Sequence, residues 1–146
     1  MTAPIMIVDD SDAGLALTMR ALKKSGLRVD VTLAHNGIAA LHLLHGARPE
    51  EGEAARLPGI VLLDLKMPGV DGLMVLRRIR ADERTRCLPV VIISSSNEHA
   101  DVGACYQGGA NSYIHKRVDI DDFIDAMRIL HQYWSLNELP PEQPGT

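Results

Sequence analysis

Three aspartates follow short apolar runs of this sequence. Asp9 and Asp10 come directly after Ile5–Val8, and Asp64 comes directly after Ile60–Leu63. Four apolar residues followed by turn residues are typical of short, buried strands rather than of buried helices. Open α/β sheets bind their ligands at the carboxyl ends of the strands. We therefore expect the three carboxylates to share one pocket at the edge of a parallel sheet.

Crowded carboxylates predict a cation. They raise one another's pKa unless a positive charge lies among them. Their hard oxygen atoms suit Mg²⁺, which takes one or two carboxylates and keeps several of its waters. In the alternative interpretation, Asp10 only caps the following helix, Asp9 is solvated and Asp64 caps its loop. Because three acids coincide, the pattern favours the Mg²⁺ site.

Two further polar residues end the remaining core strands. Ser94 follows the apolar run Pro89–Ile93, and Lys116 follows the short segment Ser112–His115. An ammonium and a hydroxyl that face carboxylates and Mg²⁺ would bind an anion, for which a phosphoryl group is the natural candidate. Alternatively, Lys116 is a surface lysine and Ser94 is a neighbour of a helix cap. Four polar strand ends that point the same way favour the anion site.

The whole chain alternates short apolar runs with amphipathic segments, and this alternation positions the polar strand ends. Strands are predicted at Ile5–Val8, Val29–Ala34, Ile60–Leu63, Pro89–Ile93 and Ser112–His115. Helices are predicted after Ser11 or Asp12, Asn36, Asp71, Asn97 and Asp119. Such alternation predicts one doubly wound α/β domain, in which five helices cover a five-stranded parallel sheet.

Composition excludes several classes of protein. A chain of 146 residues with 46% hydrophobic content suits one domain with a sizeable core. The net charge of −4 argues against duplex nucleic acid as the main partner. Cys87 and Cys105 match no metal or redox spacing, which indicates a reducing cytoplasm. No segment has the pattern expected for export or for spanning a membrane.

The sequence resembles the receiver domain of bacterial two-component response regulators over nearly its whole length. The spacing of the full set is specific: Asp9-Asp10, Asp64, Met67-Pro68, Asp71-Gly72, Ser94, Tyr113 and Lys116. The resemblance implies a flavodoxin-like sheet of strand order 2-1-3-4-5. It also implies a receiver domain over residues 1–136, followed by a tail at 137–146.

The resemblance implies that Asp64 accepts a phosphoryl group from a histidine kinase. Asp10 and Asp64, with the backbone carbonyl of Lys66, would hold Mg²⁺, and Asp9 would act mainly through the water shell of the metal. The side chain of Lys66 is expected to be solvated. An alternative is that it leans over the phosphoryl group and alters its hydrolysis.

The resemblance also implies roles for the residues on the fourth and fifth strands. Lys116 would pair with the phosphoryl oxygens, Ser94 would swing toward the phosphoryl group, and Tyr113 would move inward in step. The family usually has proline after this lysine, in a bond that is commonly cis, and here the residue is Arg117. A non-proline cis bond costs ~2.5–4 kcal/mol. We therefore expect a trans or strained Lys116–Arg117 bond and a displaced Lys116.

Because the receiver fold would use the chain up to about Leu136, we expect no DNA-binding or other output domain, and signalling by docking. Ala126, Ile129 and Tyr133 would form a second apolar face on the last helix, although singly exposed residues are an equal alternative. The Tyr133-Trp134 ending and the long loop Ala47–Pro58 resemble single-domain receivers of phytochrome-type kinases. Those receivers imply a homodimer through the fourth helix, fifth strand and fifth helix.

Two other functions remain open at this stage. A haloacid-dehalogenase-type phosphatase also uses an aspartate nucleophile with Mg²⁺, but it requires a second aspartate at the position of Lys66. A pseudo-receiver that is never phosphorylated is favoured by Arg117 and disfavoured by the intact acids. The sequence therefore favours a signalling protein that assists its own phosphorylation and dephosphorylation, not an enzyme with a separate substrate.

Overall fold

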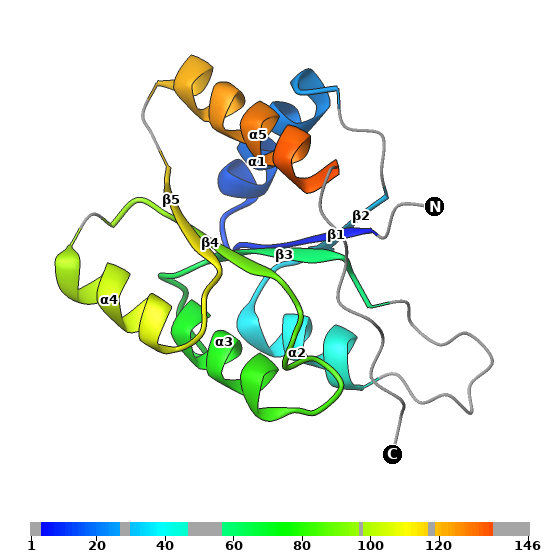
Figure 1. The fold of residues 1–146 in the computed structure, drawn as a ribbon, viewed down its shortest axis with the longest axis vertical. Helices are drawn as coiled ribbons and strands as arrows, with labels where there is room; N and C mark the ends of the chain where they lie inside the picture. Colours follow the sequence, from blue (N-terminus) through cyan, green and yellow to red (C-terminus); the bar gives the residue numbers. More distant parts are fainter. Residues whose placement is uncertain (1–3, 27–29, 47–56, 97, 117–118, 136–146) are drawn as a thin grey trace.

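The computed structural model describes residues 4–26, 30–46, 57–96, 98–116 and 119–135. Strands and helices alternate along the described chain (Figure 1): β1 Ile5–Val8, α1 Asp12–Lys24, β2 Val31–Ala34, α2 Gly37–His45, β3 Ile60–Asp64, α3 Gly72–Ala81, β4 Val90–Ser94, α4 His99–Gln107, β5 Ser112–His115 and α5 Ile120–Ser135. The strands form one parallel sheet of order β2-β1-β3-β4-β5. The predicted doubly wound fold and its strand order are confirmed.

Helices cover both faces of the sheet. Figure 1 shows α1 and α5 on one face and α2, α3 and α4 on the other. Successive side chains of a strand point to opposite faces, so Ile7 packs in the cluster of α1 and α5, whereas Val8 packs in the cluster beneath α2 and α3. Both faces of the sheet are therefore buried, which explains the uninterrupted apolar runs of β1, β3 and β4.

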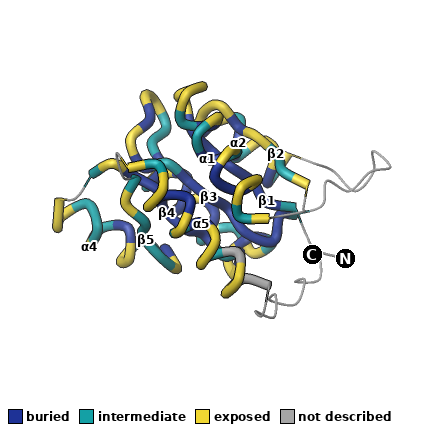
Figure 2. Tube along the Cα trace, turned by 90° about the horizontal axis from the view of Figure 1, so that it is seen from above, coloured by how far each residue is buried: buried dark blue, intermediate teal, exposed yellow. Residues whose placement is uncertain are grey.

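Exposure follows this layering. Figure 2 shows buried residues concentrated in the strands and exposed residues on the outer faces of the helices. The edge strand β2 is less buried than its neighbours, and Leu33 is 39% exposed. This lower burial agrees with its place at one end of the strand order, where, among the described strands, it pairs only with β1.

Side-chain caps begin the first three helices. Oxygens of Ser11, Asn36 and Asp71 accept hydrogen bonds from backbone N–H groups three residues further on, at 3.1, 2.7 and 2.9 Å. Helix α4 differs, because Glu98 occupies its N-cap position and makes no side-chain cap bond. The cap expected at Asn97 is therefore wrong by one position, and Asn97 itself lies outside the described residues.

Some boundaries differ from the sequence expectations. β4 runs from Val90 to Ser94, one residue later than predicted, and β3 extends to include Asp64. The expected loop at 47–58, the Lys116–Arg117 bond and the tail at 137–146 lie wholly or partly outside the described residues. Within the part of the chain that the structure describes, no helix combines the length and apolar character that a membrane span requires.

Candidate functional site

The carboxyl edge of the sheet brings three aspartates together. β1 and β3 are neighbours in register, with Val8 opposite Leu63, so the residues that follow them lie at the same edge. Asp9, Asp10 and Asp64 each offer a carboxylate oxygen, and these oxygens lie within 4.8 Å of one another. Asp9 is buried, Asp64 is half-buried and Asp10 is exposed. The cluster therefore opens to solvent on the side of Asp10.

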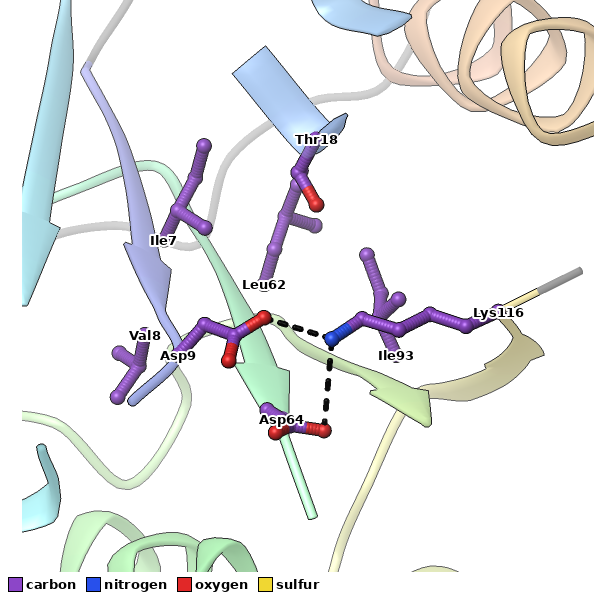
Figure 3. Close-up of a pocket in the computed structure, with 8 residues that line it drawn as sticks. All are labelled: Ile7, Val8, Asp9, Thr18, Leu62, Asp64, Ile93 and Lys116. Carbon is purple, nitrogen blue, oxygen red and sulfur yellow. Dashed lines mark hydrogen bonds and ion pairs between the residues drawn. The ribbon is translucent and has the colours of Figure 1, made fainter. Parts of the chain in front are cut away.

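Lys116 supplies positive charge to this cluster from the far side of β4. Its Nζ donates a hydrogen bond to Asp9 Oδ2 at 2.6 Å and lies 3.8 Å from Asp64 Oδ1 (Figure 3). In the figure the lysine stem passes Ile93 and its ammonium reaches between the two carboxylates. Thr18 of α1 completes the lining of a small cavity beside them. Lys116 thus partly neutralises the negative charge of the three carboxylates.

Burial is the main reason why Asp64 is a weaker acid than an ordinary aspartate. It raises the pKa of the Asp64 carboxyl from 3.8 to about 6, although the ammonium of Lys116 lowers this pKa. The neighbouring carboxylates of Asp9 and Asp10 also raise it, and about 6 is the net result of all these effects. The charged form of Asp64 is therefore destabilised in the folded protein, and an added cation would stabilise it.

Close backbone approach fixes the two central acids. Asp9 Oδ1 accepts a hydrogen bond from the backbone N–H of Ser11 at 3.0 Å. A Cβ atom at Gly14 would overlap the Asp9 carboxylate, so only glycine lets α1 begin this close to the acid. A Cβ atom at Gly72 would likewise overlap the backbone carbonyl oxygen of Asp64. The two glycines allow α1 and α3 to pack directly against the site.

Ser94 and Tyr113 both contact Ser96 in the loop after β4. The buried Ser94 accepts a hydrogen bond at Oγ from the Ser96 backbone N–H at 3.1 Å. The Tyr113 hydroxyl donates to the Ser96 backbone carbonyl at 2.8 Å. The two residues expected to move together are thus joined through one loop residue, which sequence reasoning did not single out.

Lys66 has a partner that the sequence did not predict. Its Nζ lies 3.2 Å from Asp101 Oδ2 in the first turn of α4. The Ser96 hydroxyl donates to the same carboxylate oxygen at 2.6 Å. The sequence offered no spacing signal for this contact, because only the fold brings the loop after β3 beside α4. The lysine side chain is 64% exposed, and its ion pair among the described residues is with Asp101.

The apolar face expected on α5 is narrower than predicted. Ile129 and Tyr133 are 65% and 66% exposed. Ala126, however, is half-buried and packs against the core cluster of α1 and α5. Ala126 sits at the boundary of the buried stripe, so only the other two residues present large apolar side chains.

Comparison with known proteins identifies the family. The sequence profile of the response regulator receiver domain matches residues 5–128. The chain therefore belongs to the response regulator receiver family.

Two known proteins are similar to the chain over most of their length. The chain is 36% identical over 130 residues to the probable methanogenesis regulatory protein FilR2 of Methanothrix harundinacea, covering 89% of this chain and 82% of that protein. It is 30% identical over 130 residues to response regulator Rcp1 of Synechocystis, covering 89% and 87% of the two chains.

Solved structures agree with the sequence relatives. The phosphorylated cyanobacterial phytochrome response regulator RcpA superposes with a TM-score of 0.86 at 27% identity, covering 97% of this chain and all of that one. The Mn²⁺-bound form of Rcp1 gives a TM-score of 0.83 at 28% identity, covering 95% and 99%. The chain is therefore close in fold and length to phytochrome response regulators.

The raised pKa of Asp64 predicts that replacing its carboxylate with a neutral side chain increases the free energy of unfolding, by an amount that depends on pH. Between about pH 4 and pH 6 the folded state keeps a proton that the unfolded state has lost, so stability falls as the pH rises through this window. Without added metal, Asp64→Asn should therefore be more stable than the wild type above about pH 7. The gain should be about 1–2 kcal/mol, because partial exposure screens the full shift.

Urea unfolding at several pH values measures this difference. The gain of Asp64→Asn should shrink through the window and vanish below about pH 4, where both states of the wild type are protonated. Asp122→Asn, at an exposed position in the first turn of α5, is the matched control for the removal of one surface carboxylate. If Asp64→Asn gives no gain in stability, or the same gain at every pH, the Asp64 carboxylate does not destabilise the folded protein in this way.

Proposed function

We propose that this chain is a response regulator in which Asp64 accepts a phosphoryl group from a sensor histidine kinase with the help of Mg²⁺. One observation carries the proposal: three carboxylates and one ammonium converge at the carboxyl edge of the sheet, and Asp64 lies among them. Family membership supports the same reading. The proposed receiver domain spans residues 1–136, with a tail at 137–146.

The donor set fits Mg²⁺. Its side chains offer only carboxylate oxygens, the ligands that hard divalent cations prefer, and they are close enough to act on one ion. In the proposal, Asp10, Asp64 and the backbone carbonyl of Lys66 hold the metal, and Asp9 acts through its waters. The Mn²⁺-bound form of Rcp1, a relative of similar fold, supports a divalent site at this position. When bound, the ion supplies charge that offsets the phosphoryl oxygens.

Phosphoryl transfer in this site needs a charged, correctly placed nucleophile. One Asp64 oxygen forms a bond to phosphorus while the bond to the donor breaks, and the donor keeps that electron pair. Because the pKa of Asp64 is about 6, its carboxylate is available at neutral pH. Lys116 lies 3.8 Å from Asp64 and would pair with the phosphoryl oxygens as its hold on Asp9 loosens.

The switch is proposed to start at Ser94. A phosphoryl group on Asp64 adds nearly two negative charges at the edge of the sheet. Ser94 would turn its hydroxyl toward them and release the Ser96 backbone N–H, to which it is bonded here. Tyr113, bonded to the carbonyl of Ser96, would then move inward. The changed surface would signal by docking.

The proposed partner is a sensor histidine kinase of the phytochrome type. The support is likeness to RcpA, which is described as a phytochrome response regulator, and to Rcp1. The free thiols Cys87 and Cys105 favour a cytoplasmic setting, where thiols stay reduced. In this proposal the chain is a signalling protein that assists its own phosphorylation and dephosphorylation, without turnover of a separate substrate.

Incubation with a small-molecule phosphodonor and Mg²⁺ tests the function. Intact-mass measurement should show one phosphoryl group on the wild type and none on Asp64→Asn, because the amide cannot form the acyl phosphate. Asp122→Asn is the control and should be labelled like the wild type. Labelling should fail when the metal is removed by a chelator.

The other outcomes identify the rival functions. No adduct on the wild type would indicate a pseudo-receiver, which is favoured by the closer approach of Lys116 to Asp9 than to Asp64. Continuous consumption of a phosphate ester would indicate a phosphatase. Lys66 stands where that class requires a second aspartate, and its side chain pairs with Asp101 instead.

We further propose a homodimer through α4, β5 and α5. The support is the exposed pair Ile129 and Tyr133 on α5. Light scattering should give the mass of two chains, at least with a phosphoryl mimic bound, and Tyr133→Lys should shift the protein toward monomer. Arg20→Glu, an exposed change on α1, should leave the mass unchanged. Monomer alone, with and without the mimic, would contradict the dimer.

A further inference from the structure

One carboxylate oxygen joins the loop after β3 to the start of α4. Asp101 Oδ2 lies 3.2 Å from Lys66 Nζ and accepts a hydrogen bond from the Ser96 hydroxyl at 2.6 Å. Lys66 stands two residues after Asp64, whereas Asp101 belongs to the first turn of α4. The ion pair thus ties the segment that carries the phosphoryl acceptor directly to a helix on the surface.

The same cluster reaches the switch residues. Ser96 bonds Asp101 through its hydroxyl, Ser94 through its backbone N–H and Tyr113 through its carbonyl oxygen. A change at Asp101 would therefore act on Ser96, which is hydrogen-bonded to both Ser94 and Tyr113. The ion pair between Lys66 and Asp101 also links Ser96 to the segment that follows Asp64, by a route that does not include Ser94.

Charge holds the cluster in its resting arrangement. Hydrogen bonding to Asp101 raises the pKa of the Lys66 ammonium. The Ser96 hydroxyl, followed by Lys66, lowers the pKa of the Asp101 carboxyl. Both groups are fully charged at neutral pH, so their attraction persists unless a stronger anion competes for the lysine.

Phosphorylation would create such a competitor nearby. An acyl phosphate on Asp64 carries nearly two negative charges, against one on Asp101. The Lys66 side chain is 64% exposed and has a flexible four-carbon stem, so it can change partners without repacking the core. The competition is modest in size because exposed ion pairs are weak.

We propose that Lys66 passes from Asp101 to the phosphoryl group when Asp64 is phosphorylated, and that the freed Asp101 loosens the start of α4. Asp101 is thus a positioning residue that keeps the ammonium of Lys66 away from the acceptor at rest. This inference rests on the proposed phosphorylation of Asp64.

Helix α4 is suited to respond. Its N-cap residue Glu98 makes no side-chain cap bond, and Cys105 is the only residue within His99–Gln107 that is fully buried. A short helix with little buried surface opens at low cost. Release of one contact in its first turn therefore has a measurable effect on the backbone of this helix.

A double-mutant cycle with beryllofluoride, a phosphoryl mimic, tests the exchange in the presence of Mg²⁺. Asp101→Asn removes the competitor and should tighten binding of the mimic about two- to fivefold, the range that exposed ion pairs support. Lys66→Gln keeps the backbone carbonyl and should weaken binding by a similar factor. Adding Asp101→Asn to Lys66→Gln should change nothing further, because the competition needs the lysine.

Two controls separate this effect from general charge. Asp125→Asn breaks a comparable surface pair, with Arg128 on α5 at 2.8 Å, and should leave mimic affinity unchanged. The Lys66→Gln background measures what loss of the Asp101 charge does by itself. Equal effects of Asp101→Asn with and without Lys66, or no effect in either, would overturn the exchange.

Hydrogen exchange of the α4 amides tests the second half of the inference. Exchange should quicken in the wild type when the mimic binds, and Asp101→Asn should show the quicker exchange without it. Unchanged α4 exchange in the wild type with mimic bound would overturn the release of α4. If the wild type binds no mimic at all, the proposed function itself fails, which is distinct from a protein that binds the mimic without coupling.

Discussion

The burial of the Asp64 carboxylate beside two other carboxylates is the constraint on which this structure depends. Asp9 and Asp64 lie at the end of neighbouring strands, and burial makes the charge on Asp64 costly. Lys116 offsets part of this cost, but its single ammonium lies closer to Asp9 than to Asp64. The pocket therefore keeps a deficit of positive charge beside Asp64, which is the condition that favours binding of a divalent cation.

The fold positions this pocket by burying the strands that lead into it. Strands β1, β3 and β4 are packed on both faces, so the backbone positions of their carboxyl ends are fixed by two hydrophobic clusters. Gly14 and Gly72 let the following helices close in on the acids. Ser96 connects Ser94, at the end of β4, to Asp101 in the first turn of α4, a helix with little buried surface. In the proposed function, a firmly positioned Asp64 beside a helix with little buried surface would provide a physical basis for signalling.

Patterns of neighbouring residues in the sequence predicted the strands and the acidic residues that follow them. Apolar runs followed by acids located Asp9, Asp10 and Asp64, because a parallel strand buried on both faces leaves a continuous signal in the sequence. The pair of Lys66 with Asp101 left no such signal, since it joins elements that meet only in the folded chain. The place of Lys116 at this edge was predicted from the strand that precedes it, but its hydrogen bond to Asp9, across β4, depends on the folded chain. Whether Ala126 is exposed depends on how α5 is rotated against α1, which periodicity resolves only approximately.

The central claim is that Asp64 binds either a proton or, with its neighbours, a metal ion. The most direct measurement is calorimetric titration with Mg²⁺ in two buffers of different ionisation enthalpy, which counts protons released on binding. Near pH 6 the wild type should release about half a proton per ion, because its carboxyl is about half protonated there. Above about pH 8 it should release almost none. Binding of Mg²⁺ with no proton release at pH 6, or no binding at either pH, would contradict the account.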